Sequence, residues 1–279
     1  MRKITLVPVG GLGNRIEAIS TAWAYCRTNG VKLQILWFKD PGLNCDYEQL
    51  FSIAQHAQEL IEIRNGKGLD FLLRDNPRKK NFWIPQLFER YLFDACFYYH
   101  SNDLKIEDED PLKDTSISRF SNIFLVTCGV YWKTTDMYDW IKPQKEVTDA
   151  AQQFMNRLGD APIGLHIRRT DNQNTIQYSP TSLYQKVMDE EIKLNPNVRF
   201  YLASDSLDEK KYLINLYGDL IITNLKVVKR DTREGIIDAF VEMNVLSQLT
   251  RIYAGDSSFA RISSHLGNVP FILLDTRLS

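Results

Sequence analysis

The residues with the clearest chemistry lie between positions 163 and 171, where a short apolar run is followed by charged side chains. These side chains are His166, Arg168, Arg169 and Asp171. Ligands of parallel α/β sheets bind at the carboxyl ends of the strands, and the fixed forks of adjacent guanidiniums suit phosphate oxygens. The motif therefore predicts phosphate binding. The alternative is an exposed strand end whose arginines form salt bridges with nearby acids.

The elements around this motif predict a βαβ unit. A buried strand is expected at 161–167, and a helix at 182–194 that Thr181 or Ser182 would cap. A second strand at 198–203 is followed by Asp205. Polar residues thus follow both strands, as expected for a ligand site on an open parallel sheet. Asp205 either contacts the ligand or caps the next helix, predicted at 207–217, and both interpretations stay open.

The amino-terminal segment repeats this organisation. An apolar strand at 3–9 is followed by Gly10-Gly11-Leu12-Gly13-Asn14-Arg15, a helix at about 15–28 and another strand at 31–37. Such a loop lets a phosphate approach backbone N–H groups at the positive end of the helix. Its spacing matches neither the dinucleotide fingerprint nor the P-loop, and a tight turn that needs positive φ at glycine is equally compatible. With the arginine motif, the loop suggests two nucleotide-binding-like halves that face each other.

The carboxyl-terminal third contains a third candidate anion contact. An apolar helix at 236–248 and a strand at 251–254 precede Gly255-Asp256-Ser257-Ser258-Phe259, which opens a last helix through His265. A helix that begins in this way offers hydroxyls and free backbone donors to an anion. The alternative is ordinary N-capping by Asp256 or Ser257 without a ligand.

In combination, these motifs resemble a known enzyme family. The pattern His-x-Arg-Arg-x-Asp after a strand, an Ile-Ile-Asp238-Ala helix that ends in Leu-Ser-Gln, and Ser257-Ser258-Phe before the last helix resemble the α1,6-fucosyltransferases of N-glycan cores and rhizobial Nod factors. The opening Gly-x-Gly-Asn-Arg is similar to the corresponding loop of the protein O-fucosyltransferases. The resemblance covers residues 6–29 and about 140–275, whereas the segment 41–140 has no match.

The resemblance implies an α/β fold of the GT-B type, with two Rossmann-like domains whose parallel sheets face a central cleft. It also implies inverting transfer from a GDP-fucose donor, with no metal and no other cofactor. Arg168 would bind the β-phosphate, His166 would shape the nucleotide pocket, and Asn14 would approach the donor from the other domain. The expected catalytic residues are Arg168, Asn14 and Asp171, and the expected donor-binding residues are Gly11, Gly13, His166, Arg169, Asp205, Asp238, Ser257 and Ser258.

One departure from the family concerns the general base. The core fucosyltransferases have a glutamate shortly after the arginine motif, whereas residues 172–177 here contain no carboxylate. Sugar transfer develops negative charge on the departing diphosphate, which preorganised cations and donors stabilise. The attacking hydroxyl also needs a proton acceptor within hydrogen-bond reach, or a transition state in which deprotonation comes late. Asp171 is the nearest carboxylate and Glu17 is a second candidate, with an Asp171 that orients the arginines as the alternative.

The length of 279 residues and the resemblance together predict an amino-terminal acceptor-side domain at 1–142 and a nucleotide-sugar-binding domain at 143–279. The net charge of −1 gives no reason to expect nucleic acid as a partner. Four scattered cysteines predict reduced thiols, and no membrane-spanning run or signal peptide is visible. These features favour a cytoplasmic bacterial protein and leave room for a peripheral contact with the inner membrane.

Three functions remain open at this stage. The first is a fucosyltransferase that acts on a glycan acceptor. The second is a GT-B transferase with another donor, because arginines recognise a diphosphate and not the sugar or the base. The third is a catalytically silent protein that binds a sugar nucleotide or a glycan, which the missing glutamate favours. An NAD-dependent oxidoreductase is disfavoured because the glycine loop lacks the fingerprint and its later acid.

Overall fold

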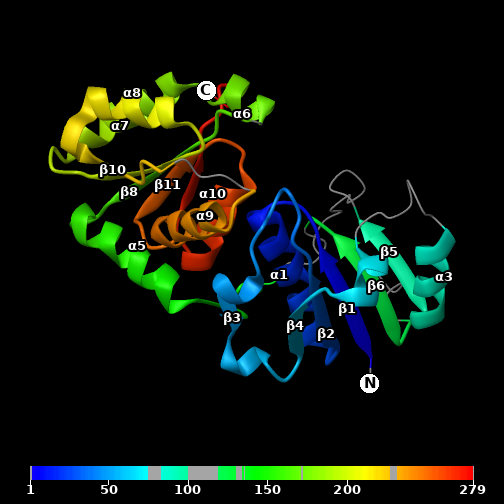
Figure 1. The fold of residues 1–279 in the computed structure, drawn as a ribbon. Helices are drawn as coiled ribbons and strands as arrows, with labels where there is room; N and C mark the ends of the chain where they lie inside the picture. Colours follow the sequence, from blue (N-terminus) through cyan, green and yellow to red (C-terminus); the bar gives the residue numbers. More distant parts are fainter. Residues whose placement is uncertain are drawn as a thin grey trace. The chain divides into compact units, whose positions relative to one another are not determined.

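The protein is described by a computed structural model that covers residues 2–74, 83–99, 119–129, 134, 136–170, 172–226 and 231–278. The chain divides into two compact units, Met1–Pro143 and Gln144–Ser279, and each has its own sheet (Figure 1). We describe each unit by itself. The predicted α/β class is confirmed, because each unit combines helices with a parallel five-stranded sheet.

Unit 1 is built on a parallel sheet in the order β4-β2-β1-β6-β5. Its strands are β1 (Lys3–Pro8), β2 (Lys32–Trp37), β4 (Ile61–Asn65), β5 (Ala95–Tyr99) and β6 (Asn122–Thr127), and its helices are α1 (Leu12–Asn29) and α3 (Trp83–Leu92). Short 3-10 helices occur at Tyr47–Gln49, Gln55–Ala57 and Gly68–Leu73, and β3 (Phe51–Ile53) pairs antiparallel with β7 (Ile141–Pro143). The apolar run of β1 is buried from Ile4 onward, which suits the central strand of a sheet with both faces covered.

Unit 2 has a second parallel sheet, in the order β10-β9-β8-β11-β12. Its strands are β8 (Ile163–Ile167), β9 (Phe200–Ser204), β10 (Ile221–Thr223), β11 (Arg251–Ala254) and β12 (Phe271–Leu273). Its helices are α5 (Lys145–Leu158), α6 (Gln173–Tyr178), α7 (Thr181–Leu194), α8 (Leu207–Tyr217), α9 (Arg233–Leu246) and α10 (Ser258–Gly267). A last 3-10 turn occurs at Gly218–Leu220.

The two faces of this second sheet are covered by different helices. On one face Leu165 and Leu202 pack with Tyr184 and Met188 of α7 and with Leu213 of α8. The helices α5 and α9 pack against each other and α9 also contacts β9. Gly164 explains how closely α9 approaches β8, because a Cβ there would lie 2.9 Å from a methyl of Leu246. The sheet is therefore buried on both sides, and its ligand-accessible part is the carboxyl edge.

Two local predictions in unit 2 were wrong for identifiable reasons. The strand predicted from residue 161 begins at Ile163, because Ala161 has a φ of 52° and cannot extend the strand. Helix α7 is not capped by Thr181 or Ser182, since its N-cap position is Pro180. The Thr181 hydroxyl instead donates to the Glu209 carboxylate at 2.5 Å.

Candidate functional site

The carboxyl edge of the unit 2 sheet contains a topological switch point. From β8 the chain continues through β9 to β10 on one side, whereas β11 and β12 lie on the other side. Open α/β sheets bind ligands in the crevice outside the strand ends at such a point. The residues that follow β8 and β11, Arg168 and Gly255 through Ser257, are therefore placed where a ligand is expected.

A buried tyrosine joins the two strand ends across this switch point. The Tyr184 hydroxyl donates to the carbonyl oxygen of His166 at 3.0 Å and accepts the N–H of Gly255 at 2.8 Å. The ring of Tyr184 is fully buried, and burial raises the pKa of its hydroxyl, so the group stays a neutral donor. Because one hydroxyl satisfies a backbone group on each strand, the spacing between the ends of β8 and β11 is fixed.

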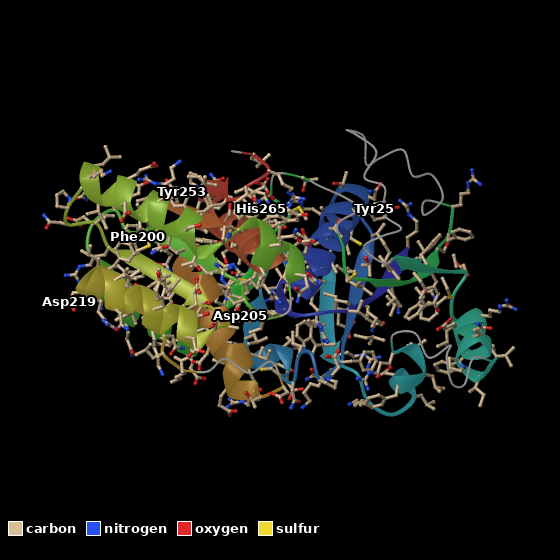
Figure 2. The ribbon with its side chains drawn as sticks, turned by 90° about the horizontal axis from the view of Figure 1, so that it is seen from above. Tyr25, Phe200, Asp205, Asp219, Tyr253 and His265 are labelled. Atoms are coloured by element: carbon tan, nitrogen blue, oxygen red, sulfur yellow. The ribbon has the colours of Figure 1, made fainter. Side chains whose placement is uncertain are left out.

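Asp205 holds the loop that carries the arginines. Its carboxylate accepts the backbone N–H of Arg169 at 2.7 Å and the hydroxyl of Thr170 at 2.6 Å. The Nε of Arg168 lies 3.8 Å from the same carboxylate. Phe200 begins β9, and Asp205 follows the last residue of that strand (Figure 2). The N-cap interpretation of Asp205 is wrong, because Ser206 occupies that position and accepts the N–H of Glu209.

The two adjacent arginines have different environments. The Arg169 guanidinium donates to the Glu209 carboxylate at 3.2 Å, to the Thr181 hydroxyl at 3.1 Å and to the Arg168 carbonyl oxygen at 2.9 Å. It also lies over the Tyr184 ring, 5.9 Å from its centroid. Arg169 is thus engaged by α7 and α8. The side chain of Arg168 is 17% exposed and its ion pair with Asp205 is long.

The N-terminus of α10 contributes polar groups next to β8. The imidazole of His166 stacks on the Phe259 ring, with centroids 5.0 Å apart and planes 19° apart. Ser257 is at the N-cap position of α10, but its hydroxyl makes no capping hydrogen bond. That hydroxyl is buried and has no hydrogen-bond partner among the residues that the structure describes. A buried polar group of this kind is costly unless a ligand or a water completes it.

Helix α6 fixes the loop that precedes α10. The Asn172 amide and the Thr175 hydroxyl both donate to the Asp256 carbonyl oxygen, each at 3.1 Å. Asn172 also caps α6 by accepting the N–H of Thr175 at 3.1 Å. A Cβ at Gly255 would lie 2.5 Å from atoms of Ser179 and Thr175, so only glycine fits this approach. Helix α6, which our sequence analysis did not predict, therefore holds the Asp256–Ser257 turn in place.

Asp238 lies on α9 with its side chain 20% exposed, and the Lys226 ammonium is 3.6 Å away. Below it, Glu242 forms a buried ion pair with Lys210, 3.0 Å long, and Lys210 also donates to the Asn224 carbonyl oxygen at 2.7 Å. Burial raises the pKa of Glu242 to about 7, with smaller contributions from Asp238 and Asp205 that Lys210 opposes.

In unit 1, the glycine loop occupies the corresponding switch point between β1 and β6. Gly10 has a φ of 88°, and Gly11 is the N-cap of α1, which begins at Leu12 and includes Gly13. A Cβ at Gly10 would lie 2.9 Å from the amide nitrogen of Asn14, so the Asn14 side chain folds over Gly10. The positive φ thus falls on Gly10, and α1 starts three residues earlier than predicted.

Arg15 fastens this loop to the end of β2. Its buried guanidinium donates to the Gly10 carbonyl oxygen at 2.8 Å and also to the Phe38 carbonyl oxygen, and it pairs with the Asp40 carboxylate. The guanidinium lies over the Trp37 ring, 5.0 Å from its centroid. Arg15 is therefore a structural residue of the loop.

Of the predicted site residues, the structure brings His166, Arg168, Arg169, Asp205, Ser257 and Ser258 to one edge of the unit 2 sheet, with Asp238 on α9. Gly11, Gly13 and Asn14 lie together in unit 1. Asp171 lies outside the described residues. Within the described residues, no group of three or more His, Cys, Asp or Glu side chains could hold a metal ion.

Comparison with known proteins places this geometry in a known fold. No protein-family model and no curated sequence matches the chain. Among solved structures, the NodZ α1,6-fucosyltransferase soaked with GDP-fucose has a TM-score of 0.60 at 17% identity, over 98% of this chain and 94% of that one. A second NodZ structure, from Bradyrhizobium, has a TM-score of 0.59 at 17% identity, over 98% of this chain and 95% of that one.

Two other similar structures are of proteins with other names. A variant of Arabidopsis thaliana FUT1 in complex with GDP has a TM-score of 0.61 at 16% identity, over 98% of this chain and 70% of that one. POFUT1 in complex with GDP has a TM-score of 0.59 at 11% identity, over 98% and 98%. The chain has the fold of the fucosyltransferases. The GT-B-like class and the resemblance stated from the sequence are thus confirmed at the level of the fold.

No helix in the described ranges combines the length and the apolar character that a membrane crossing requires.

Proposed function

We propose that the protein is an inverting, metal-independent fucosyltransferase that moves fucose from GDP-fucose to a hydroxyl of a glycan. The observation that carries this proposal is that Arg168 and the α10 N-terminus, with its buried Ser257 hydroxyl, follow the neighbouring strands β8 and β11 at the switch point of the unit 2 sheet. The structural neighbours that were solved with GDP or GDP-fucose support the choice of donor.

In this proposal the bond between the anomeric carbon and the β-phosphate oxygen breaks, and the acceptor oxygen forms the new bond from the opposite face. GDP leaves with the electron pair, so negative charge grows on its diphosphate. Arg168 donates to the β-phosphate, while the Ser257 hydroxyl and the first N–H groups of α10 donate to the same anion. These donors are held by Asp205, Tyr184 and α6, so little reorganisation is needed when the bond breaks.

The remaining expected residues take supporting roles. Arg169, through Glu209 and Thr181, positions the Arg168 loop. The stacked rings of His166 and Phe259 form one wall of the nucleotide pocket, and Asp238 offers a carboxylate to donors on the base. Unit 2 is then the donor domain and unit 1 the acceptor-side domain, from which Asn14 approaches the donor.

The acceptor hydroxyl must lose its proton to a base. In residues 172–177, where the core fucosyltransferases have their glutamate, this chain forms α6 and uses Asn172 and Thr175 to hold the Asp256 turn. Asp171 and Glu17 are the remaining candidates for the base. If neither acts as the base, the proton is lost late, after a loose transition state. The alternative is a protein that binds sugar nucleotides without turnover, and this is the second candidate function, which the α6 packing favours.

The donor is tested by thermal shift with GDP, UDP, ADP and NAD, each with and without EDTA. A ligand that binds only the folded state raises its stability by mass action. We expect GDP to raise the melting temperature and EDTA to leave the shift unchanged. Stabilisation by UDP or ADP without GDP would exclude fucose transfer from GDP-fucose and favour another donor. GDP binding with neither donor hydrolysis nor transfer to an acceptor panel would favour the silent protein.

A cytoplasmic location and a peripheral membrane contact stay predictions.

A further inference from the structure

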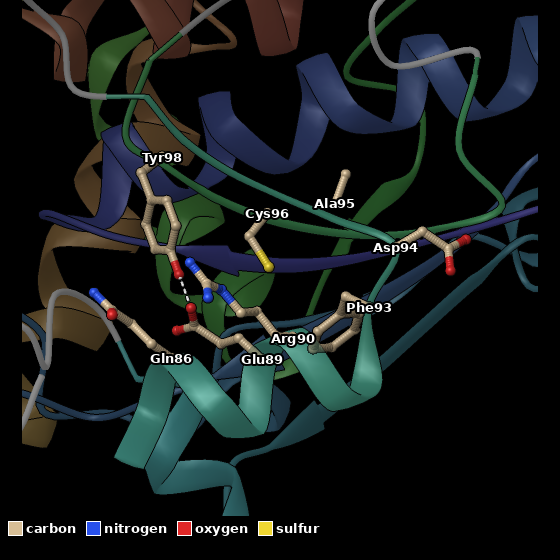
Figure 3. Close-up of a pocket in the computed structure, with 8 residues that line it drawn as sticks. All are labelled: Gln86, Glu89, Arg90, Phe93, Asp94, Ala95, Cys96 and Tyr98. Carbon is tan, nitrogen blue, oxygen red and sulfur yellow. Dashed lines mark hydrogen bonds between the residues drawn. The ribbon is translucent and has the colours of Figure 1, made fainter. Parts of the chain in front are cut away.

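A pocket of about 340 Å³ lies in unit 1, between α3 and the edge strand β5 (Figure 3). Its lining residues are Gln86, Glu89, Arg90, Phe93, Asp94, Ala95, Cys96 and Tyr98. This volume falls in the range of small-molecule sites. The pocket belongs to the segment 41–140, which the resemblance stated from the sequence does not cover.

The polar side chains of this pocket are held in place. Glu89 is 3% exposed, and its carboxylate accepts the hydroxyl of Tyr98 across the pocket. Asp94, at the other end, accepts the backbone N–H groups of Ser121 and Asn122 at 3.1 and 2.8 Å. Burying a carboxylate is costly, and a hydrogen-bonded carboxylate beside a cavity offers further acceptor positions to a ligand.

The aromatic part of the pocket is equally well supported. The ring of Phe93 stacks on the buried Phe124 at a centroid distance of 5.0 Å, and Tyr98 meets the same Phe124 edge-on at 6.0 Å. Two fixed rings thus form apolar surface next to the acceptors, and such rings gain binding energy with little loss of side-chain freedom.

The charge balance of the lining indicates the class of ligand. The buried carboxylate of Glu89 and the exposed guanidinium of Arg90 give the lining charges of both signs, which suit neither an anion nor a cation. A neutral molecule with several hydroxyls satisfies both groups, because each hydroxyl both donates and accepts. The amide of Gln86 adds a donor and an acceptor, and the ring faces suit the C–H surface of a pyranose.

We propose that this pocket is a saccharide subsite for a neutral pyranose unit of a glycan. Its assignment to the acceptor glycan rests on the proposed fucosyl transfer, but saccharide binding itself does not. Glu89 and Arg90 bind the hydroxyls of the sugar and the rings of Phe93 and Tyr98 pack on its apolar face.

The test is calorimetric titration of the full chain with maltotriose, α-mannotriose and N,N′,N″-triacetylchitotriose. We expect at least one of them to bind. Arg90→Gln should raise the Kd of that saccharide at least about tenfold, since a charged hydrogen-bond partner is lost. Ala95→Leu fills the pocket without changing a charge and should weaken binding equally. Lys142→Gln removes an exposed cation of the same unit that does not line the pocket, and it serves as the matched control.

Cys96 gives an independent readout, because its thiol lines the pocket and is partly exposed. The bound saccharide should slow alkylation of Cys96 and leave alkylation of Cys128, which is also partly exposed, unchanged in the same sample. Failure of all three saccharides to bind, binding that survives both pocket variants, or equal protection of both thiols would overturn the subsite.

The outcome can be separated from that of the proposed function. If GDP stabilises the protein but no saccharide binds in this pocket, the subsite is wrong and the transferase proposal stands. If saccharide binding depends on Arg90 and GDP has no effect, the subsite stands and the transferase proposal fails.

Discussion

The guanidinium of Arg169 lies 3.2 Å from the carboxylate of Glu209, so the second arginine of the motif is tied to helix α8. Its neighbour Arg168 instead lies beside Asp205 at 3.8 Å. The two side chains are similarly exposed, at 17% and 15%, but they have different acidic partners. The two arginines should therefore respond differently to substitution.

Arg168→Ala should abolish transfer while the protein stays folded. A contact to the leaving group strengthens as charge develops, so its loss should raise the barrier by on the order of 3 kcal/mol or more, which is at least a hundredfold in kcat. Arg168→Lys should also be poor, because a point charge cannot replace the fork. Activity and the melting temperature are measured for each variant. Arg199→Ala is the control, because Arg199 is exposed and precedes β9, at the edge of the sheet opposite to Arg168. Near-normal turnover in Arg168→Ala would contradict the assignment of Arg168 to the leaving diphosphate.

Arg169→Met should act on stability. The Arg169 and Glu209 side chains are only 15% and 13% exposed, and removing one partner of such a pair leaves an uncompensated charge that costs about 3 kcal/mol. Denaturant unfolding of Arg169→Met, Glu209→Gln and the double variant measures the coupling. We expect the double variant to be much more stable than the sum of the single losses predicts. Additive losses would show that the pair does not hold the loop.

Ser257→Ala should separate ligand binding from stability. Its buried hydroxyl has no partner among the described residues, so removal should leave the free energy of unfolding unchanged or slightly raised. GDP affinity should fall about tenfold, the effect of one lost hydrogen bond to an anion. Ser263→Ala is the matched control, because that buried hydroxyl of the same helix donates to the Phe259 carbonyl oxygen at 2.9 Å. Unchanged GDP affinity in Ser257→Ala would exclude the hydroxyl from the donor site.

The sequence was sufficient to predict the strand ends that build the site, because β1, β8 and β9 are apolar runs bounded by glycine or polar residues. It could not show that Arg169 pairs with Glu209, since the two residues lie 40 positions apart in the chain. Helix α6 was missed because its short polar sequence has no hydrophobic period, and its role depends on Gly255, a distant contact. The pocket between α3 and β5 was missed because the sequence alone cannot show that the carboxylate of Glu89 is buried with the Tyr98 hydroxyl as its hydrogen-bond donor.

The buried pair of Lys210 and Glu242 predicts a dependence of stability on pH. Burial raises the pKa of Glu242 from 4.5 to about 7, so between these values the folded state binds more protons than the unfolded state. Unfolding free energy therefore contains a contribution that is present below about pH 4.5 and is lost as the pH rises towards about 7. Urea unfolding of wild type and Glu242→Gln across this window measures the difference between their unfolding free energies. The wild type should lose stability relative to Glu242→Gln as the pH rises. A difference that does not vary with pH would contradict the raised pKa.

Asp171→Asn addresses the missing glutamate. If Asp171 accepts the proton of the acceptor hydroxyl, turnover should fall by roughly two to four orders of magnitude with GDP affinity preserved. If it orients Arg168 or Arg169 instead, the same change should weaken GDP binding and lower the melting temperature together. We expect the second outcome, because an acid two or three residues from paired arginines fixes their geometry more readily than it reaches an acceptor. An inactive variant with full GDP affinity would contradict this expectation, and a fully active one would exclude both roles and make Glu17 the next candidate for the base.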